Sequence, residues 1–102
     1  AGPPQWNNKY NFISYLSRQK RENQVYAVTP DGKNQWQITS GDMSSGWHSW
    51  SPDGKWLVMD RSTHDERGYD IYLMNYKTKK TVRLTDSWKT EQAPVFVLIK
   101  NP

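Results

Sequence analysis

The sequence predicts an all-β protein made of short antiparallel strands, and three observations support this prediction. Short runs of apolar, aromatic or β-branched residues alternate with turn signals such as Pro-Asp-Gly along almost the whole chain. No segment keeps a helical period of apolar residues over three turns, so helices are not expected. The chain also repeats at a fixed period, which is typical of proteins built from several copies of one structural unit.

The expected strands follow one another in chain order, each between polar or glycine-containing turns. Their ranges are 3–6, 12–16, 24–28, 35–39, 47–50, 55–59, 70–74 and 81–85, with a ninth apolar run at 93–99. The strand at 3–6 is indicated only by the repeat, because its two prolines weaken it as a member of a strand ladder. At 31–32 and 53–54, Asp-Gly supplies the positive φ that a tight hairpin turn requires.

Two shifts define the repeat. A shift of 46 residues places Tyr26 over Tyr72, whereas a shift of 44 residues places 12–15 over 56–59. The two-residue difference falls in a polar stretch, where insertions are tolerated. The two Pro-Asp-Gly-Lys copies are 22 residues apart, which is half a unit. Each unit therefore has four strands in roughly 45 residues, the size of one β-propeller blade.

Three segments of the second unit carry a family resemblance. They are residues 50–55 (Trp-Ser-Pro-Asp-Gly-Lys), 70–72 (Asp-Ile-Tyr) and 83–85 (Arg-Leu-Thr). Together they resemble the WD-like β-propeller repeat of the TolB-like family. The first unit matches more loosely, with Gln-Val-Tyr at 24–26 and Gln-Ile-Thr at 37–39 in the corresponding places.

The resemblance covers roughly residues 3–96 and implies an all-β fold of two four-stranded antiparallel β-propeller blades. We expect one blade at 3–46 and a second at 47–92. Residues 93–102 are expected to add an extra strand, which either starts a third blade or closes an assembly. Such blades serve many roles, so the resemblance concerns fold rather than function.

Two blades alone would leave both outer faces bare. Closed propellers need about 4–8 blades, and the bare faces would expose an apolar patch too large for a stable monomer. The residues expected on these faces are Trp47, Trp50, Trp56, Tyr72 and Leu84. The chain is therefore expected to be part of a longer propeller or to oligomerise. Because TolB-like propellers resemble six-bladed rings, the leading expectation is a homotrimer that closes one such ring.

The C-terminal apolar run suggests how the ring would close. Residues 97–99 are apolar where the repeat would turn, so the run is expected to pair with residues 12–16 of a neighbouring copy. This pairing would compete with the chain's own residues 3–6. The residues assigned to the inter-subunit pairing are Pro94, Val95, Phe96, Val97, Leu98, Phe12, Ile13 and Tyr15.

No catalytic signature stands out in the sequence. With no Cys, no glycine-rich phosphate loop and no Ser-His-Asp order, no catalytic residue and no cofactor is expected. His48 lies on a strand beside the expected channel, where the three copies of a trimer could bind a metal, but packing between blades is the favoured interpretation. Arg61 or Arg67 is expected to form a structural ion pair with Asp70 or Asp65.

The charge of the chain is mildly positive and evenly spread. Fourteen Lys and Arg stand against ten Asp and Glu, and each half of the chain carries +2, so nucleic-acid binding is not expected. The basic runs at 17–22 and 76–80 are expected in solvated loops, with contact to an anionic partner as the alternative. No apolar run is long enough to span a membrane.

These features favour a non-enzymatic β-propeller module that self-assembles into a closed ring and binds a protein or peptide through its channel and loops. The alternative is an enzyme or part of one: a propeller lyase acting on an anionic carbohydrate, or the non-catalytic propeller of a larger peptidase. The residues leave the compartment open. The resemblance implies a bacterial periplasm or cell envelope.

Overall fold

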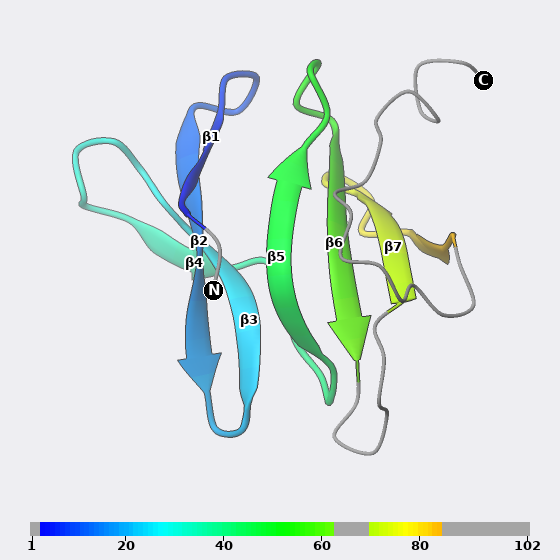
Figure 1. Cartoon of the computed structure of the whole chain (residues 1–102). Coiled ribbons are helices and arrows are strands. Elements are labelled where there is room, and N and C mark those ends of the chain that lie inside the picture. The colour runs from blue at the N-terminus through cyan, green and yellow to red at the C-terminus, as the bar shows by residue number, and fades with distance from the viewer. Residues whose placement is uncertain (1–2, 63–69, 85–102) are drawn as a thin grey trace.

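The computed structural model describes residues 3–62 and 70–84, which form eight strands in two sheets (Figure 1). The strands are β1 (Gln5–Asn7), β2 (Phe12–Gln19), β3 (Glu22–Val28), β4 (Gln35–Gln37), β5 (Ser44–Trp50), β6 (Trp56–Ser62), β7 (Asp70–Asn75) and β8 (Thr81–Arg83). The first sheet has the order β1-β2-β3-β4 and the second sheet β5-β6-β7-β8, both antiparallel throughout. The predicted all-β class and the two four-stranded antiparallel sheets are confirmed.

The strand registers follow both shifts of the sequence repeat. Between the first two strands of each sheet, the partners differ by 44 residues, and between the last two strands they differ by 46. The equivalent partners are Trp6–Ile13 and Trp50–Leu57 for the first shift, and Tyr26–Gln37 and Tyr72–Arg83 for the second. The two sheets are therefore copies of one unit at the level of individual residue pairs.

Strand β5 begins at Ser44, three residues before the start expected from sequence. The extension contains a bulge between Ser45 and His48. At this bulge the carboxylate of Asp60 accepts hydrogen bonds from the backbone N–H groups of Gly46 and Trp47, at 2.6 and 3.0 Å. This buried carboxylate satisfies the backbone donors that the bulge leaves unpaired. The limits of the three segments 3–46, 47–92 and 93–102 stay a prediction.

Strand β2 is also longer than expected and continues to Gln19. Its polar end pairs with β3, where Arg18 lies opposite Asn23 and Gln19 opposite Glu22 across a two-residue loop. The tight loop keeps the two strands in register, so polar residues extend the hairpin beyond the apolar run that signals it.

The two Pro-Asp-Gly-Lys segments form turns of the same geometry, at 29–33 and 51–55. The residue before the Pro is Thr29 in one turn and Ser51 in the other, and its hydroxyl donates to the Asp Oδ1 at 2.6 Å. The Lys backbone N–H donates to the same oxygen at 3.0 Å. The glycines have φ values of 77° and 76°. Only a residue without Cβ adopts such φ values freely, so Asp-Gly encodes this turn as expected.

The two turns without Asp-Gly, at 7–11 and 75–79, form a second type. The first residue of each is an Asn whose Oδ1 accepts two backbone N–H groups, two and three residues later, at 2.9–3.0 Å. The fifth residue has a φ of 61° or 66°, and its N–H bonds back to the carbonyl of the Asn. These turns therefore close through an Asn side chain in place of the Asp-Gly pair.

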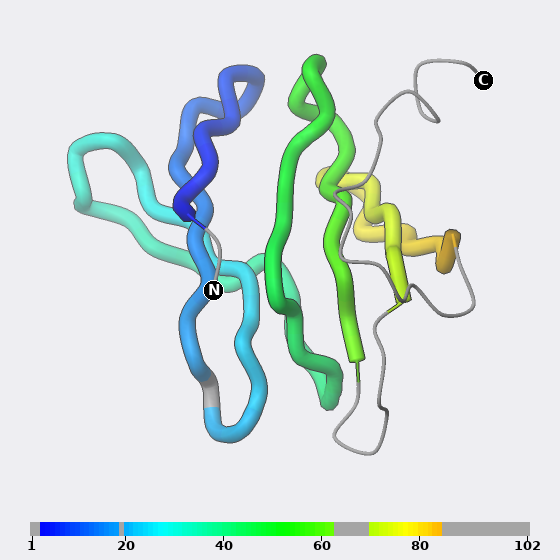
Figure 2. Tube along the Cα trace, in the orientation of Figure 1, coloured from blue at the N-terminus to red at the C-terminus, as the bar shows by residue number. Residues whose placement is uncertain are grey.

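The two sheets lie side by side, with β3 beside β5 (Figure 1). Turns 7–11 and 51–55 lie at one end of the pair, and the loop at 20–21 lies at the other (Figure 2). Asn7 of the first sheet donates from Nδ2 to the carbonyl of Gly54 in the second, at 3.0 Å. The interface between the sheets is thus tied at its turn end by a buried hydrogen bond.

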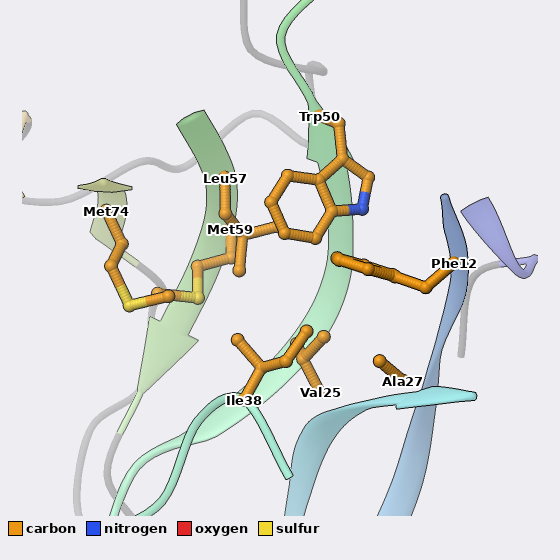
Figure 3. Packing of buried hydrophobic residues seen from close by; sticks show 8 residues of the cluster. All are labelled: Phe12, Val25, Ala27, Ile38, Trp50, Leu57, Met59 and Met74. Atoms are coloured by element: carbon orange, nitrogen blue, oxygen red, sulfur yellow. The ribbon is translucent and has the colours of Figure 1, made fainter. Parts of the chain in front are cut away.

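The hydrophobic core lies between the two sheets (Figure 3). The first sheet contributes Phe12, Val25, Ala27 and Ile38, and the second contributes Trp50, Leu57, Met59 and Met74. The ring of Phe12 meets Trp50 and Trp36 edge to face, with centroids 5.4 and 5.3 Å apart. Each such aromatic pair contributes about 0.5–1.5 kcal/mol beyond the burial of its surface.

Candidate functional site

His48, the metal candidate, lies between the two sheets. Its Nε2 is 2.7 Å from the hydroxyl of Ser14 in the first sheet, and Trp50 Nε1 donates to the same hydroxyl at 2.8 Å. The side chain of His48 is only 3% exposed. Over residues 3–62 and 70–84, no group of three or more His, Cys, Asp or Glu could hold a metal ion. The geometry makes His48 a contact between sheets, and one imidazole without neighbouring ligands is a poor metal site.

Two buried ionisable groups near this contact have shifted pKa values. Burial lowers the pKa of His48 to about 4, so the imidazole is neutral at pH 7, and its Nδ1 has no hydrogen-bond partner within the described part of the chain. Burial raises the pKa of Asp60, although the two backbone N–H groups that the carboxylate accepts act in the opposite direction. Both shifts follow from removing a charged form from water.

Arg61 forms a different contact from the one expected. It lies opposite Asp70 in the β6–β7 register, yet its guanidinium donates to Gln24 Oε1 at 3.0 Å and to the carbonyl of Met43 at 2.7 Å. Asp70 instead pairs with Arg83, at 3.4 Å. The predicted pair of Arg61 with Asp70 is therefore wrong, because the long side chain reaches across to the first sheet. The partners Arg67 and Asp65 lie outside the described residues.

The residues assigned to inter-subunit pairing fall in three different places. Phe12 is in the core between the sheets, with 1% of its surface exposed. Ile13 and Tyr15 are half-buried, and Tyr15 stacks on Tyr26 with ring centroids 6.0 Å apart. Residues 94–98 lie outside the described residues. Strand β1 already pairs with β2 over residues 12–14, so an incoming strand would have to displace it. The pairing between subunits stays a prediction.

Two of the residues expected on bare outer faces lie in the interface instead. Trp50 is 7% exposed in the core, and Tyr72 packs against the same cluster. Of the others, Trp47 and Trp56 are half-buried and Leu84 is 40% exposed. The expectation for Trp50 and Tyr72 is wrong because they lie on the face of the second sheet that the first sheet covers. Sequence periodicity separates two faces but does not indicate which one is covered.

The register shows what the two remaining faces are made of. Side chains on paired strands alternate between the two faces of a sheet, so equivalent residues of the two units lie on equivalent faces. The uncovered face of the first sheet carries Trp6, Ile13, Tyr15 and Val28, which are equivalent to the core residues Trp50, Leu57, Met59 and Met74. The face of the second sheet away from the first carries Trp56, Leu73, Val82 and Leu84, which are equivalent to Phe12, Ala27, Trp36 and Ile38.

The turn end of the interface gathers basic and aromatic side chains. The Nζ atoms of Lys9 and Lys77 lie 5.4 and 5.6 Å from the ring centroid of Tyr10, and Lys79 Nζ lies 3.9 Å from that of Tyr76. The two tyrosine rings are 4.9 Å apart. We call these five residues the lysine seam. It joins the turn at 7–11 to the turn at 75–79, and thus one sheet to the other.

Sequence reasoning missed several buried polar residues. Ser14, Gln24 and Asp60 were not expected to matter, yet all three are buried and hydrogen-bonded. A signal was available for Ser14, a polar residue that alternation places on the same face as Phe12 and Leu16. Alternation places Gln24 and Asp60 on the opposite faces of their sheets, so no such signal existed for them. The lysine seam was missed because its two turns are far apart in the chain.

Three comparisons place the chain among known proteins. No protein-family model matches it, and no curated protein sequence matches it. The crystal structure of TolB from Acinetobacter baumannii is similar, with a TM-score of 0.68 and 26% sequence identity over 83% of this chain and 21% of that one. The chain thus spans about a fifth of the length of that TolB. The two four-stranded antiparallel sheets, whose registers repeat each other, fit two blades of a TolB-like β-propeller.

Proposed function

We propose that this chain is a non-enzymatic propeller module that assembles through the outer faces of its two blades and binds a protein or peptide partner. The observation that carries the proposal is the equivalence of faces between the blades. Each outer face is the repeat equivalent of a face that is buried between blade 1 (β1–β4) and blade 2 (β5–β8). The two outer faces of the module are therefore copies of the two faces that pack against each other in its interior.

This arrangement favours a head-to-tail contact. Blade 2 can receive the outer face of another blade 1, because the residues concerned repeat those of the internal interface. Such a contact is heterologous, and it closes a ring when the rotation from blade to blade divides a full turn evenly. Three copies of two blades would make the six-bladed ring that the family resemblance implies.

The exposed apolar residues on both outer faces support this assembly. Trp6 on blade 1 is 53% exposed, and Val82 and Leu84 on blade 2 are 55% and 40% exposed. Large apolar side chains that gather on an exposed face often mark a site of interaction with another protein. Further blades of the same gene product could cover these faces equally well, since the matched TolB is about five times longer than the matched region.

The assembly is tested by blocking one face at a time. Trp6→Lys blocks the outer face of blade 1, and Val82→Lys with Leu84→Lys blocks that of blade 2. Light scattering and native mass spectrometry should find a trimer for the parent chain and monomers for both variants. Asn34→Lys adds the same charge on an exposed turn and should leave the trimer intact.

A mixture of the two blocked variants gives the sharper result. Each retains one intact face, so a head-to-tail contact predicts a one-to-one heterodimer that grows no further. A folded monomer of the parent chain at micromolar concentration, or a mixture that stays monomeric, would refute the self-assembly.

The enzymatic alternatives have no observation in their favour over residues 3–62 and 70–84. A metal-dependent lyase would need His48 accessible and joined by other ligands, but the imidazole is buried against Ser14. A role as the non-catalytic propeller of a peptidase depends on a hydrolase domain beyond this sequence.

A further inference from the structure

The lysine seam brings three ammonium groups from two blades onto one pair of tyrosine rings. Lys9 comes from blade 1, and Lys77 and Lys79 come from the last turn of blade 2. Lys79 is held in place twice, by the Tyr76 ring beneath its Nζ and by a 2.7 Å hydrogen bond that its Nζ donates to the Tyr76 carbonyl. A ring face attracts an ammonium group, so the tyrosines orient these charges while the lysines remain exposed.

These like charges have no acidic counterpart in the part of the chain that the structure describes. Within residues 3–62 and 70–84, none of the three lysines has a carboxylate within ion-pair distance, and the cation that pairs with Asp70 is Arg83. Partial burial and then the neighbouring charge of Lys77 lower the pKa of Lys79. A cluster of oriented, unpaired cations concentrates positive potential at one spot, where an anion would be attracted.

We propose that the lysine seam binds an acidic peptide segment. This inference rests on the proposed partner-binding role of the module and states where the partner docks and what chemistry it has. Lysine ammonium groups recognise carboxylates through charge-assisted hydrogen bonds. Because the tyrosine rings already hold the lysines, little side-chain freedom is lost when the partner arrives.

The surroundings of the lysine seam favour a short acidic segment over a long polyanion. The turn at 51–55 touches both sides of the seam, since Asn7 donates to the Gly54 carbonyl and the Tyr76 N–H donates to the Lys55 carbonyl, each at 3.0 Å. This turn carries Asp53, whose pKa is lowered by the Ser51 hydroxyl and the Lys55 N–H, so it is ionised at pH 7. A nucleic acid or an extended anionic glycan would meet this negative charge. The tyrosine faces, already covered by lysines, offer little room for base stacking.

The experiment uses a fluorescein-labelled peptide of alternating Glu and Ser, with a Gln and Ser peptide for comparison. Fluorescence anisotropy at low salt should show binding of the Glu peptide alone. In the variant K9Q/K77Q/K79Q, binding should weaken about tenfold or more, because three carboxylate contacts are lost. The variant R18Q/K20Q/R21Q removes the same charge at the opposite end and should change the affinity by less than about threefold.

A charge-reversed variant distinguishes a loss of the peptide contacts from a loss of folding. The variant K9E/K77E/K79E should reject the Glu peptide and bind a peptide of alternating Lys and Ser. Equal affinity of K9Q/K77Q/K79Q and the parent chain, or an equal loss in the opposite-end variant, would overturn the proposal. So would tighter binding of oligo-dT or polygalacturonate than of the Glu peptide.

Binding and assembly are separated by measuring the Glu peptide on the assembly-blocked Trp6→Lys variant. The monomeric variant should bind the Glu peptide as the parent chain does. If the parent chain binds the peptide but never trimerises, the peptide site at the lysine seam is supported and self-assembly is refuted. If the parent chain forms a trimer but does not bind the peptide, peptide binding at the lysine seam is refuted and the assembly is supported.

Discussion

His48 and Ser14 come from different blades and meet at 2.7 Å in a region that is almost closed to solvent. Arg61 and Gln24 meet across the same interface at 3.0 Å. A buried polar group that loses its partner costs about 1–3 kcal/mol, so these pairs penalise any other alignment of the two blades. Apolar contacts bring the sheets together without direction, and the polar pairs select one alignment.

Stability should therefore fall as the pH is lowered through the range in which His48 titrates. The pKa of His48 is about 4 in the folded chain against an ordinary value of 6.5, so the unfolded chain takes up its proton first. The contribution is fully present above about pH 6.5 and is lost toward pH 4, by about 3 kcal/mol in total. Urea unfolding at pH 7 and at pH 5 measures the loss.

His48→Gln supplies the control, because its amide does not titrate. The variant should be less stable than the parent chain at pH 7 but should lose much less stability at pH 5. Asp60 acts in the opposite direction: its raised pKa favours the folded state in acid, and this contribution is lost as the pH rises through that pKa. Equal losses in the parent and the variant would exclude His48 as the source of the pH dependence.

Two types of turn connect the strands, and they are used in a fixed pattern. Asp-Gly turns occur at 29–33 and 51–55, whereas Asn-headed turns occur at 7–11 and 75–79. Where turns of the two types touch, at Asn7 and Gly54, the interface leaves no space for an extra atom. A Cβ on Gly54 would lie 2.8 Å from the Cβ of Lys9. The glycine thus serves both the turn and the packing of one blade on the next.

A pair of glycine substitutions separates these two effects. Gly32→Ala introduces a side chain at a φ of 77° with no atom within 4 Å, so it should cost only the left-handed strain of about 1–2 kcal/mol. Gly54→Ala has almost the same φ, 76°, but also overpacks the interface and should cost about 1–3 kcal/mol more. Urea denaturation of both variants checks the difference. Equal costs would show that the turn at 51–55 moves aside freely.

For the whole molecule, the main question is how two blades become stable. A small chain buries a limited fraction of its surface, and each blade of a repeat protein relies on its neighbours. Blade 1 and blade 2 cover one face of each other, and the equivalent outer faces expose Trp6 on blade 1 and Val82 and Leu84 on blade 2. On the same face of blade 2, however, Val58 and Ile71 are buried. Assembly would supply the missing neighbours, and its free energy would then be part of the stability of the fold.

The melting temperature should therefore depend on protein concentration. Raising the concentration of the parent chain from about 1 to about 100 µM should raise its melting temperature by several degrees, because association stabilises only the folded state. Trp6→Lys, which blocks one face, should melt at a lower temperature that does not change with concentration. Scanning calorimetry at several concentrations gives the answer, and a parent chain whose melting temperature is constant would argue against coupled folding and assembly.

The sequence by itself determined the elements, the turns and the number of blades. Asp-Gly turns depend on local geometry, and the shifts of 44 and 46 residues report a period, so both could be read without coordinates. The start of β5 at Ser44 could not be read, since that strand end depends on the carboxylate of Asp60 from the next strand.

Only the tertiary structure decided which face of each blade is covered, which polar groups meet, and that Lys9 and Lys77 share one ring. Strand and turn formation depends on neighbours along the chain, where residue type is a direct guide. Packing of one blade on the other depends on residues distant in sequence. The alternation along a strand defines two faces but does not indicate which of them is buried. Trp50, expected on a bare face, lies in the core for this reason.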